Sequence, residues 1–145
     1  MRIKSFLLVF FQLLFLFLFF ATGPVFANNY ALSIVELAAI ILGVWAIIHM
    51  KRNSKFSGFP TPAEQAKLLH SGPYQYIRNP MYTAWLLVMG VLLLDFYTPI
   101  RLVIYILEIV VLLTKISIEE KLLTEKFTDY AAYKSRTKRL IPFVY

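Results

Sequence analysis

The chain has 145 residues, of which 59% are hydrophobic and only 16% are charged. Soluble domains have about 25% charged residues, so this composition excludes an ordinary soluble fold and indicates a membrane protein. The net charge of +7 comes from Lys and Arg at the ends of apolar runs, so it indicates membrane topology and anionic lipid headgroups rather than nucleic acid. The absence of cysteine excludes disulfides, thiolate metal sites, cysteine nucleophiles and palmitoylation.

The first apolar run, residues 6–27, carries no charge and has two interpretations. It is long enough for the roughly 20 residues that a helix needs to cross the hydrocarbon core, which predicts an N-terminal transmembrane helix. The basic N-terminus, the Gly23-Pro24 break and the small-x-small sequence ending at Ala27 are also typical of a signal peptide. Residues 1–27 are therefore a transmembrane helix or a signal peptide, and residues 28–145 form the remaining domain.

Three further apolar runs follow along the chain. Residues 30–50 and 100–118 are long enough to span a bilayer. Residues 81–94 span it only if their helix begins near Asn79-Pro80 and runs to Phe96, or if the bilayer thins locally. The turn residues 95–99 predict an antiparallel hairpin between the last two runs. Together the four runs predict an all-α fold, a polytopic integral membrane helical bundle with about four transmembrane helices.

Charged residues inside the runs are expected to face the interior of the bundle. A charge at the centre of a transmembrane helix costs on the order of 2.5 to 3.5 kcal/mol on insertion scales. Glu36 and Glu108 are therefore expected to be paired, protonated or turned inward. For Glu108 the expected neighbour is Arg101, seven residues earlier on the same face, or the cofactor cavity.

The orientation of the bundle follows from the distribution of basic residues. All Lys and Arg residues except Arg101 fall on one predicted side of the membrane. The positive-inside rule places the middle loop, residues 51–78, and the C-terminus in the cytoplasm. The N-terminus is expected there too if the first helix is retained.

The middle loop is the least regular part of the sequence. Its Phe59-Pro60-Thr61-Pro62 segment is incompatible with a regular helix. Residues 63–70 are compatible with a short helix capped by Thr61, and residues 71–74 predict a turn. Asn79-Pro80 is typical of the cap and first position of a helix, and such a helix start suits an anionic group such as a carboxylate.

The last predicted element follows the fourth apolar run. Apolar side chains fall close to helical spacing with Lys and Glu between them: Ile116, Leu123, Phe127, Tyr130 and Tyr133. This pattern predicts an amphipathic C-terminal helix that lies on the cytoplasmic face and ends near Thr137.

Four motifs in the second half of the chain point to one family. They are Gly72-Pro73-Tyr74, Arg78-Asn79-Pro80-Met81-Tyr82, Glu119-Glu120 and Phe127-Thr128-Asp129-Tyr130-Ala131-Ala132-Tyr133. In this order and spacing they resemble the isoprenylcysteine carboxyl methyltransferase family and its phospholipid N-methyltransferase relatives, over about residues 60–142. The resemblance implies an integral membrane methyltransferase that moves a methyl group from S-adenosylmethionine to a lipophilic acceptor.

The resemblance also implies which residues form the site. The cofactor pocket would be lined by Tyr74, Asn79, Pro80, Met81 and Tyr82, with Glu119 holding the cofactor and the backbone of Ala66, Lys67, Leu68 and Leu69 beside the adenosine. Lys115 would lie where relatives use a basic residue to hold the acceptor. Many members of the family have His at the position of Asn79, and Asn is an alternative found in bacterial-type members. Ala84 stands where Gly is frequent. A bacterial inner membrane is therefore the expected location.

The residue types suit methyl transfer on chemical grounds as well. A sulfonium donor needs an in-line approach and a site that excludes water, but neither a metal nor a covalent nucleophile. Its positive charge favours carboxylates and aromatic faces, at about 0.5 to 2 kcal/mol per cation–π contact. Tyr82 and Glu119 offer both, and Lys115 lies one helical turn from Glu119, where it suits an acidic acceptor. No catalytic acid or base is predicted.

Three functional interpretations remain open at this point. A carboxylate acceptor needs no general base, and no His is well placed near the motifs, which favours O-methylation. The alternatives are N-methylation of a phospholipid or small amphiphile, and a non-catalytic membrane scaffold, which Asn79 and the short chain make plausible. The expected partners are S-adenosylmethionine, a lipophilic or lipid acceptor and membrane lipids, with no nucleic acid and no metal.

Overall fold

The computed structural model describes residues 2–54 and 67–141, and this part of the chain is helical without any β-strand. The elements are α1 (Arg2–Ala21), α2 (Tyr30–Asn53), the short 3-10 helix η1 (Gly72–Gln75), α3 (Pro80–Asp95), α4 (Pro99–Lys126) and α5 (Tyr130–Arg136). The predicted all-α class is confirmed. Helices α1 and α2 are long and apolar enough to cross a membrane, and α3 is a shorter apolar helix. Four membrane crossings and a cytoplasmic last helix stay predictions.

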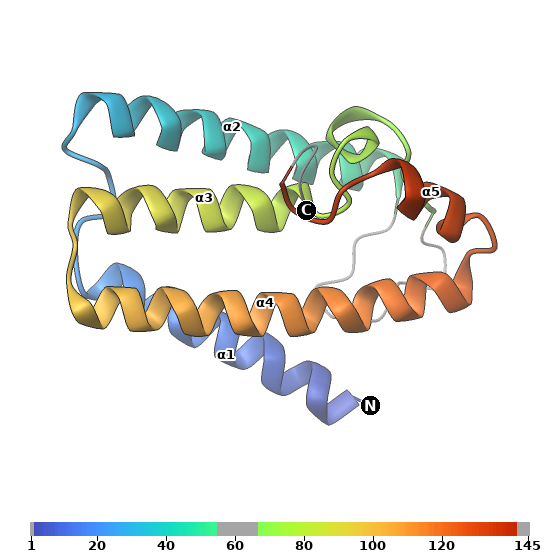
Figure 1. Ribbon diagram of the computed structural model, residues 1–145, viewed down its shortest axis with the longest axis horizontal. Helices are drawn as coiled ribbons and strands as arrows, with labels where there is room; N and C mark the ends of the chain where they lie inside the picture. The colour runs from blue at the N-terminus through green and yellow to red at the C-terminus, as the bar shows by residue number, and fades with distance from the viewer. Residues whose placement is uncertain (1, 55–66, 142–145) are drawn as a thin grey trace.

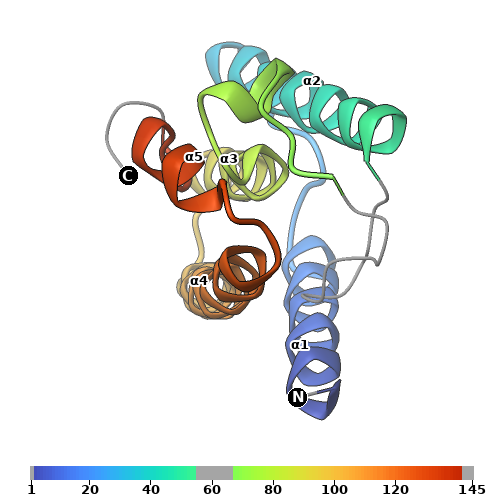
Figure 2. The same cartoon turned by 90° about the vertical axis from the view of Figure 1, so that its right-hand side faces the viewer.

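Helices α2, α3 and α4 run alongside one another in alternating directions, and α1 crosses beside α4 at an angle (Figures 1 and 2). Helix α2 packs mainly on α3, and α1 packs mainly on α4. The start of α1, the end of α2, the start of α3 and the end of α4 lie at one end of the bundle together with α5 (Figure 1). We call this the basic end, because the Lys- and Arg-rich segments of the sequence meet there.

The end of α4 differs from the prediction. The helix continues to Lys126, and the chain then breaks at Phe127, whose backbone is extended, before α5 begins. The expected amphipathic helix is therefore the last turns of α4 followed by the separate α5, which ends beside Thr137 as predicted. The short helix expected over residues 63–70 does not form at residues 67–70, and its first half lies outside the described residues.

The loop between α1 and α2 is tied to the bundle by two carboxylates. Glu36 of α2 accepts a hydrogen bond from the backbone N–H of Ala27 at 2.9 Å, which gives this buried side chain the partner that was expected of it. At the end of α3, Asp95 accepts from the backbone N–H groups of Asn28 at 2.8 Å and Asn29 at 2.9 Å. These backbone hydrogen bonds hold the pKa of Asp95 below its usual range. The junction that a signal peptidase would cut is thus part of the folded structure.

Arg101 and Glu108 do not pair, so the first of the two neighbours predicted for Glu108 is wrong, and the second, the cofactor cavity, stays a prediction. The fully buried Arg101 donates from Nη1 to the carbonyls of Leu92 and Phe96, each at 3.1 Å. The C-terminal carbonyls of a helix lack a full set of helical partners, which makes the end of α3 the nearer acceptor for this guanidinium. Its Cζ also lies 4.1 Å from the centre of the Phe19 ring of α1. Glu108 is likewise buried, and neither carboxylate oxygen has a hydrogen-bond partner among the described residues.

Candidate active site

Tyr82 in the first turn of α3 contacts Glu119 near the end of α4, thirty-seven residues away in sequence. The Tyr82 hydroxyl donates to the carboxylate, with Oη 2.9 Å from Oε1 and 3.2 Å from Oε2. The antiparallel course of α3 and α4 brings the start of one helix beside the end of the other at the basic end (Figure 1). The structure therefore brings the Pro-Tyr motif and the acidic pair together, and the binding role of these residues stays a prediction.

Lys115 completes this arrangement one helical turn before Glu119. Its buried Nζ lies 5.2 Å from the centre of the Tyr82 ring and donates to Oε1 of Gln12 at 2.9 Å. We call Gln12, Tyr82, Lys115 and Glu119 the polar cluster. The sequence reasoning missed Gln12, although one signal was present: it is the single amide in the Phe/Leu-rich run.

The two carboxylates of the acidic pair have different surroundings. Glu120 is buried and takes hydrogen bonds from Arg78 Nε and Arg139 Nη2, both at 2.9 Å, while Lys134 Nζ lies 3.5 Å away. Burial alone would raise the pKa of Glu120, but the hydrogen bonds from Arg139 and Arg78 outweigh it and hold the pKa below the usual value. Glu120 thus joins α4 to the start of α3 and to the C-terminal segment, whereas Glu119 is left for the polar cluster.

The C-terminal segment positions the motif that contains Tyr82. The backbone N–H of Arg78 donates to the carbonyl of Lys138 at 2.8 Å, and Oγ1 of Thr83 donates to the carbonyl of Leu140 at 2.7 Å. Asn79 occupies the predicted cap position of α3, but its side chain makes no capping hydrogen bond. Its Nδ2 instead donates to the Arg139 carbonyl at 3.1 Å, because the C-terminal segment runs directly beside it.

The other predicted cofactor residues are placed around this centre. Tyr74 in η1 is buried, donates to the carbonyl of Ala46 at 3.4 Å, and accepts from the hydroxyl of Tyr133 at 2.6 Å through its own carbonyl. Burial and the neighbouring Tyr133 raise the pKa of the Tyr74 phenol, which keeps it a donor at neutral pH.

Pro80 and Met81 open α3 next to Tyr82. Residues 67–69 run without helix, and the backbone N–H of Lys67 donates to Ser54 Oγ at 2.8 Å. The predicted contribution of Ala66 lies outside the described residues.

Gly72 allows η1 to begin against α2. Its φ of +61° lies in the left-handed region, and a Cβ there would come within 2.9 Å of the His49 ring. Gly72→Ala is therefore expected to lower the free energy of unfolding by about 2 kcal/mol, from backbone strain and overpacking together. In a His49→Ala background the same substitution should cost only about 1 kcal/mol, since the steric part is gone. Equal costs in the two backgrounds, measured by unfolding in detergent, would contradict this account.

Comparison with known proteins adds a family to this geometry. A family model described as phospholipid methyltransferase matches residues 29–130, from just before α2 to the start of α5. No curated protein and no solved structure gives a match. The matched segment includes Tyr82, Lys115 and Glu119 and leaves out α1.

Proposed function

The chain belongs to the phospholipid methyltransferase family, and from this premise we propose that it is a membrane enzyme that transfers a methyl group from S-adenosylmethionine to a lipophilic acceptor. The observation that carries the proposal is the contact of Tyr82 with Glu119, next to the buried Lys115. This contact brings the Glu119 carboxylate, the Tyr82 ring and the Lys115 ammonium together at the basic end of the bundle. This combination suits a binding site for a charged donor beside an amphiphilic acceptor.

The residues of the polar cluster fit the donor by their chemistry. S-adenosylmethionine supplies an activated methyl group, so the protein contributes position, charge and exclusion of water rather than a nucleophile or a metal. The partly buried Glu119 offers a carboxylate to the positive charges of the donor, and the Tyr82 hydroxyl fixes the orientation of that carboxylate. The Lys115 ammonium already lies over one face of the Tyr82 ring, and the other face is a second site of attraction for a cation. Asn79, Pro80 and Met81 shape the entrance as the first turn of α3.

Lys115 is the residue proposed to hold the acceptor. Its ammonium has three N–H donors, and Gln12 Oε1 takes one of them. An acidic head group, such as a carboxylate, is the natural partner for the others, and a carboxylate is methylated without loss of a proton. This favours O-methylation of an acidic amphiphile.

An amine-bearing phospholipid or small amphiphile is the second candidate. The observation in its favour is Glu108, a buried carboxylate without a hydrogen-bond partner among the described residues. Such a group is a partner for a cationic head group. It lies seven residues before Lys115 on the same face of α4, about 10 Å along the helix axis, and its charge still interacts with the Lys115 ammonium.

The proposal also covers the topology. We infer a multi-pass protein of a bacterial inner membrane, with the basic end and both termini in the cytoplasm. Its support is the meeting of the Lys- and Arg-rich segments at one end of the bundle (Figure 1). The donor would then reach the polar cluster from the cytoplasm, and the acceptor would enter sideways from the bilayer.

Donor binding is the decisive test. Isothermal titration of the full chain in detergent with S-adenosylmethionine is expected to show a single saturable site, and the demethylated product should compete for it. Incubating native membranes with donor labelled in the methyl group should then yield a labelled lipid-like species. The stability of its label to mild base distinguishes an amine product from the more labile ester. Absence of binding at millimolar donor would leave the non-catalytic scaffold as the better interpretation.

A further inference from the structure

Helix α1 contributes to the polar cluster although it lies outside the segment that matches the family. Gln12 of α1 is the hydrogen-bond partner of the buried Lys115. Further along α1, Phe19 is fully buried under the Arg101 guanidinium. Both buried basic residues of α4 thus have a contact on α1. A lysine held in the apolar part of a bundle needs such a partner, because an unpaired buried charge is costly.

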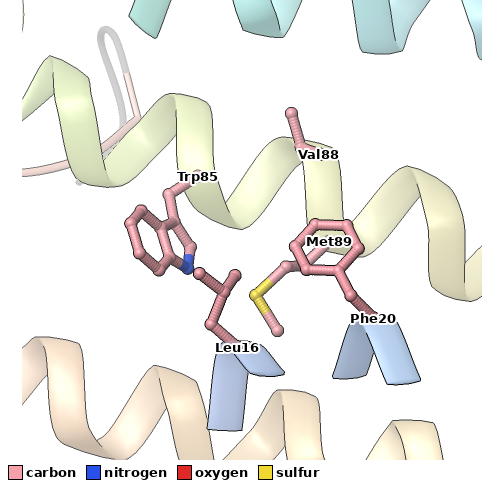
Figure 3. Close-up of a pocket in the computed structure, with 5 residues that line it drawn as sticks. All are labelled: Leu16, Phe20, Trp85, Val88 and Met89. Carbon is pink, nitrogen blue, oxygen red and sulfur yellow. The ribbon is translucent and has the colours of Figure 1, made fainter. Parts of the chain in front are cut away.

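An open apolar cavity lies beside α1, and Leu16, one helical turn after Gln12, is part of its lining. It has a volume of about 240 Å³ and is lined by Leu16 and Phe20 of α1 and by Trp85, Val88 and Met89 of α3 (Figure 3). Ligand sites generally measure about 300–1,000 Å³, so this cavity holds part of a hydrocarbon chain rather than a whole lipid. Beside it, the buried indole of Trp85 lies close to the Glu108 carboxylate.

Two residues that line the cavity follow residues of the polar cluster along their helices. On α1, Leu16 follows Gln12 by one helical turn, and on α3, Trp85 follows Tyr82 by three residues. Residues at these spacings lie on the same face of a helix. The surface between α1 and α3 therefore changes from polar to apolar within one turn, which is the pattern that an amphiphile with its head at Lys115 would require.

We propose that α1 is a retained wall of the acceptor site and that the cavity between α1 and α3 takes the hydrocarbon chain of an acidic amphiphile. The head group lies at Lys115, which Gln12 positions, and the chain passes Leu16 and Trp85 toward the bilayer. The location of the head group rests on the proposed function. The role of α1 rests on its own contacts and on the cavity.

Quenching of Trp85 fluorescence tests this proposal without an activity assay. The chain has two tryptophans, so Trp45→Phe leaves Trp85 as the single reporter. Stearic acid carrying two vicinal bromines is the probe, because bromine quenches an indole that it touches. In detergent we expect saturable quenching that unbrominated stearic acid reverses. The methyl ester of the probe, which lacks the acidic head, should bind about tenfold more weakly.

A matched pair of variants on α1 locates the chain. Leu16→Phe fills the cavity and is expected to weaken binding of the probe by about tenfold or more. Leu13→Phe makes the same change at a position that is 56% exposed on α1, and it should leave binding unchanged. Quenching that rises linearly with the probe and is identical in both variants indicates surrounding lipid only, and it would overturn the proposal.

The intact mass of the protein from native membranes provides the second measurement. We expect α1 to be present, whereas a mature N-terminus at Asn28 would overturn the proposal. Donor titration separates these results from the proposed function. Saturable, Leu16-dependent quenching without donor binding would support the role of α1 while the proposed function fails. Donor binding with unsaturable quenching would refute the role of α1 alone.

Discussion

Glu119→Gln is expected to weaken binding of S-adenosylmethionine by about tenfold to a hundredfold, the range of one charge-assisted contact, with little change in the midpoint of thermal unfolding. The amide oxygen of Gln still accepts a hydrogen bond from the Tyr82 hydroxyl, which lies 2.9 Å from Glu119 Oε1, so the packing between α3 and α4 is kept. The negative charge facing the sulfonium and the ammonium group of the donor is lost. Affinity should therefore fall without unfolding.

Glu125→Gln is the matched control for this variant. It removes a carboxylate from an exposed position of the same helix, and donor affinity measured by titration calorimetry should stay within twofold of the original. Equal affinities for the Glu119 variant and the original protein would refute the binding role of Glu119.

The pH dependence of donor binding supplies an independent check on Glu119. The residue lies beyond the apolar run that ends at residue 118, and burial raises its pKa to about 7, with Lys115 and the Tyr82 hydroxyl opposing that shift. A protonated carboxyl carries no charge for the donor, so the affinity should increase as the pH rises through about 7. Glu119→Gln should abolish this dependence. A pH profile that persists in the variant would assign the titration to another group.

The features that were predictable from the sequence are those set by local pattern. Apolar length places α2, Asn79-Pro80 marks the start of α3, and the apolar run from residue 100 gives the start of α4 within a residue. The motifs at Tyr82 and Glu119 predicted that these residues belong to one site. The antiparallel course of α3 and α4 brings them into contact. The C-terminal end of α4 was less predictable. Its last turns contain Glu and Lys, so the apolar run ends before the helix does.

The features that were missed depend on contacts between distant segments. Gln12 meets Lys115 across 103 positions, and nothing in the spacing of either residue predicts that pair. Arg101 and Glu108 have the spacing of partners, yet Arg101 binds carbonyls at the end of α3 instead. The side chain of Asn79 turns to the C-terminal segment rather than to its own helix. Sequence spacing alone does not decide which of several possible partners such a side chain binds, because the answer depends on which helices and segments lie beside it.

Glu120→Gln is expected to have the opposite consequence to the Glu119 variant, a loss of stability before any loss of affinity. The carboxylate is 4% exposed and faces Arg78, whose side chain is 8% exposed. Removing one partner of a buried ion pair leaves the other charge uncompensated, which costs about 3–5 kcal/mol. Unfolding in detergent should show a decrease in this range, against about 0.5 kcal/mol or less for Glu125→Gln. A decrease confined to donor affinity would instead assign Glu120 to the cofactor site.

Acid should weaken the same contact. The pKa of Glu120 lies below its unfolded value, so the carboxylate contributes stability above the ordinary pKa of Glu, and this contribution is lost as the pH falls through the folded value. Glu120→Gln should remove that part of the acid sensitivity. Replacing Arg78 and Glu120 together by Met should cost less than the sum of the single losses, because no uncompensated charge remains between them. Additive losses would mean that Arg78 and Glu120 stabilise the start of α3 independently. Arg78 would then act through the carbonyls of the C-terminal segment, and Glu120 through Arg139.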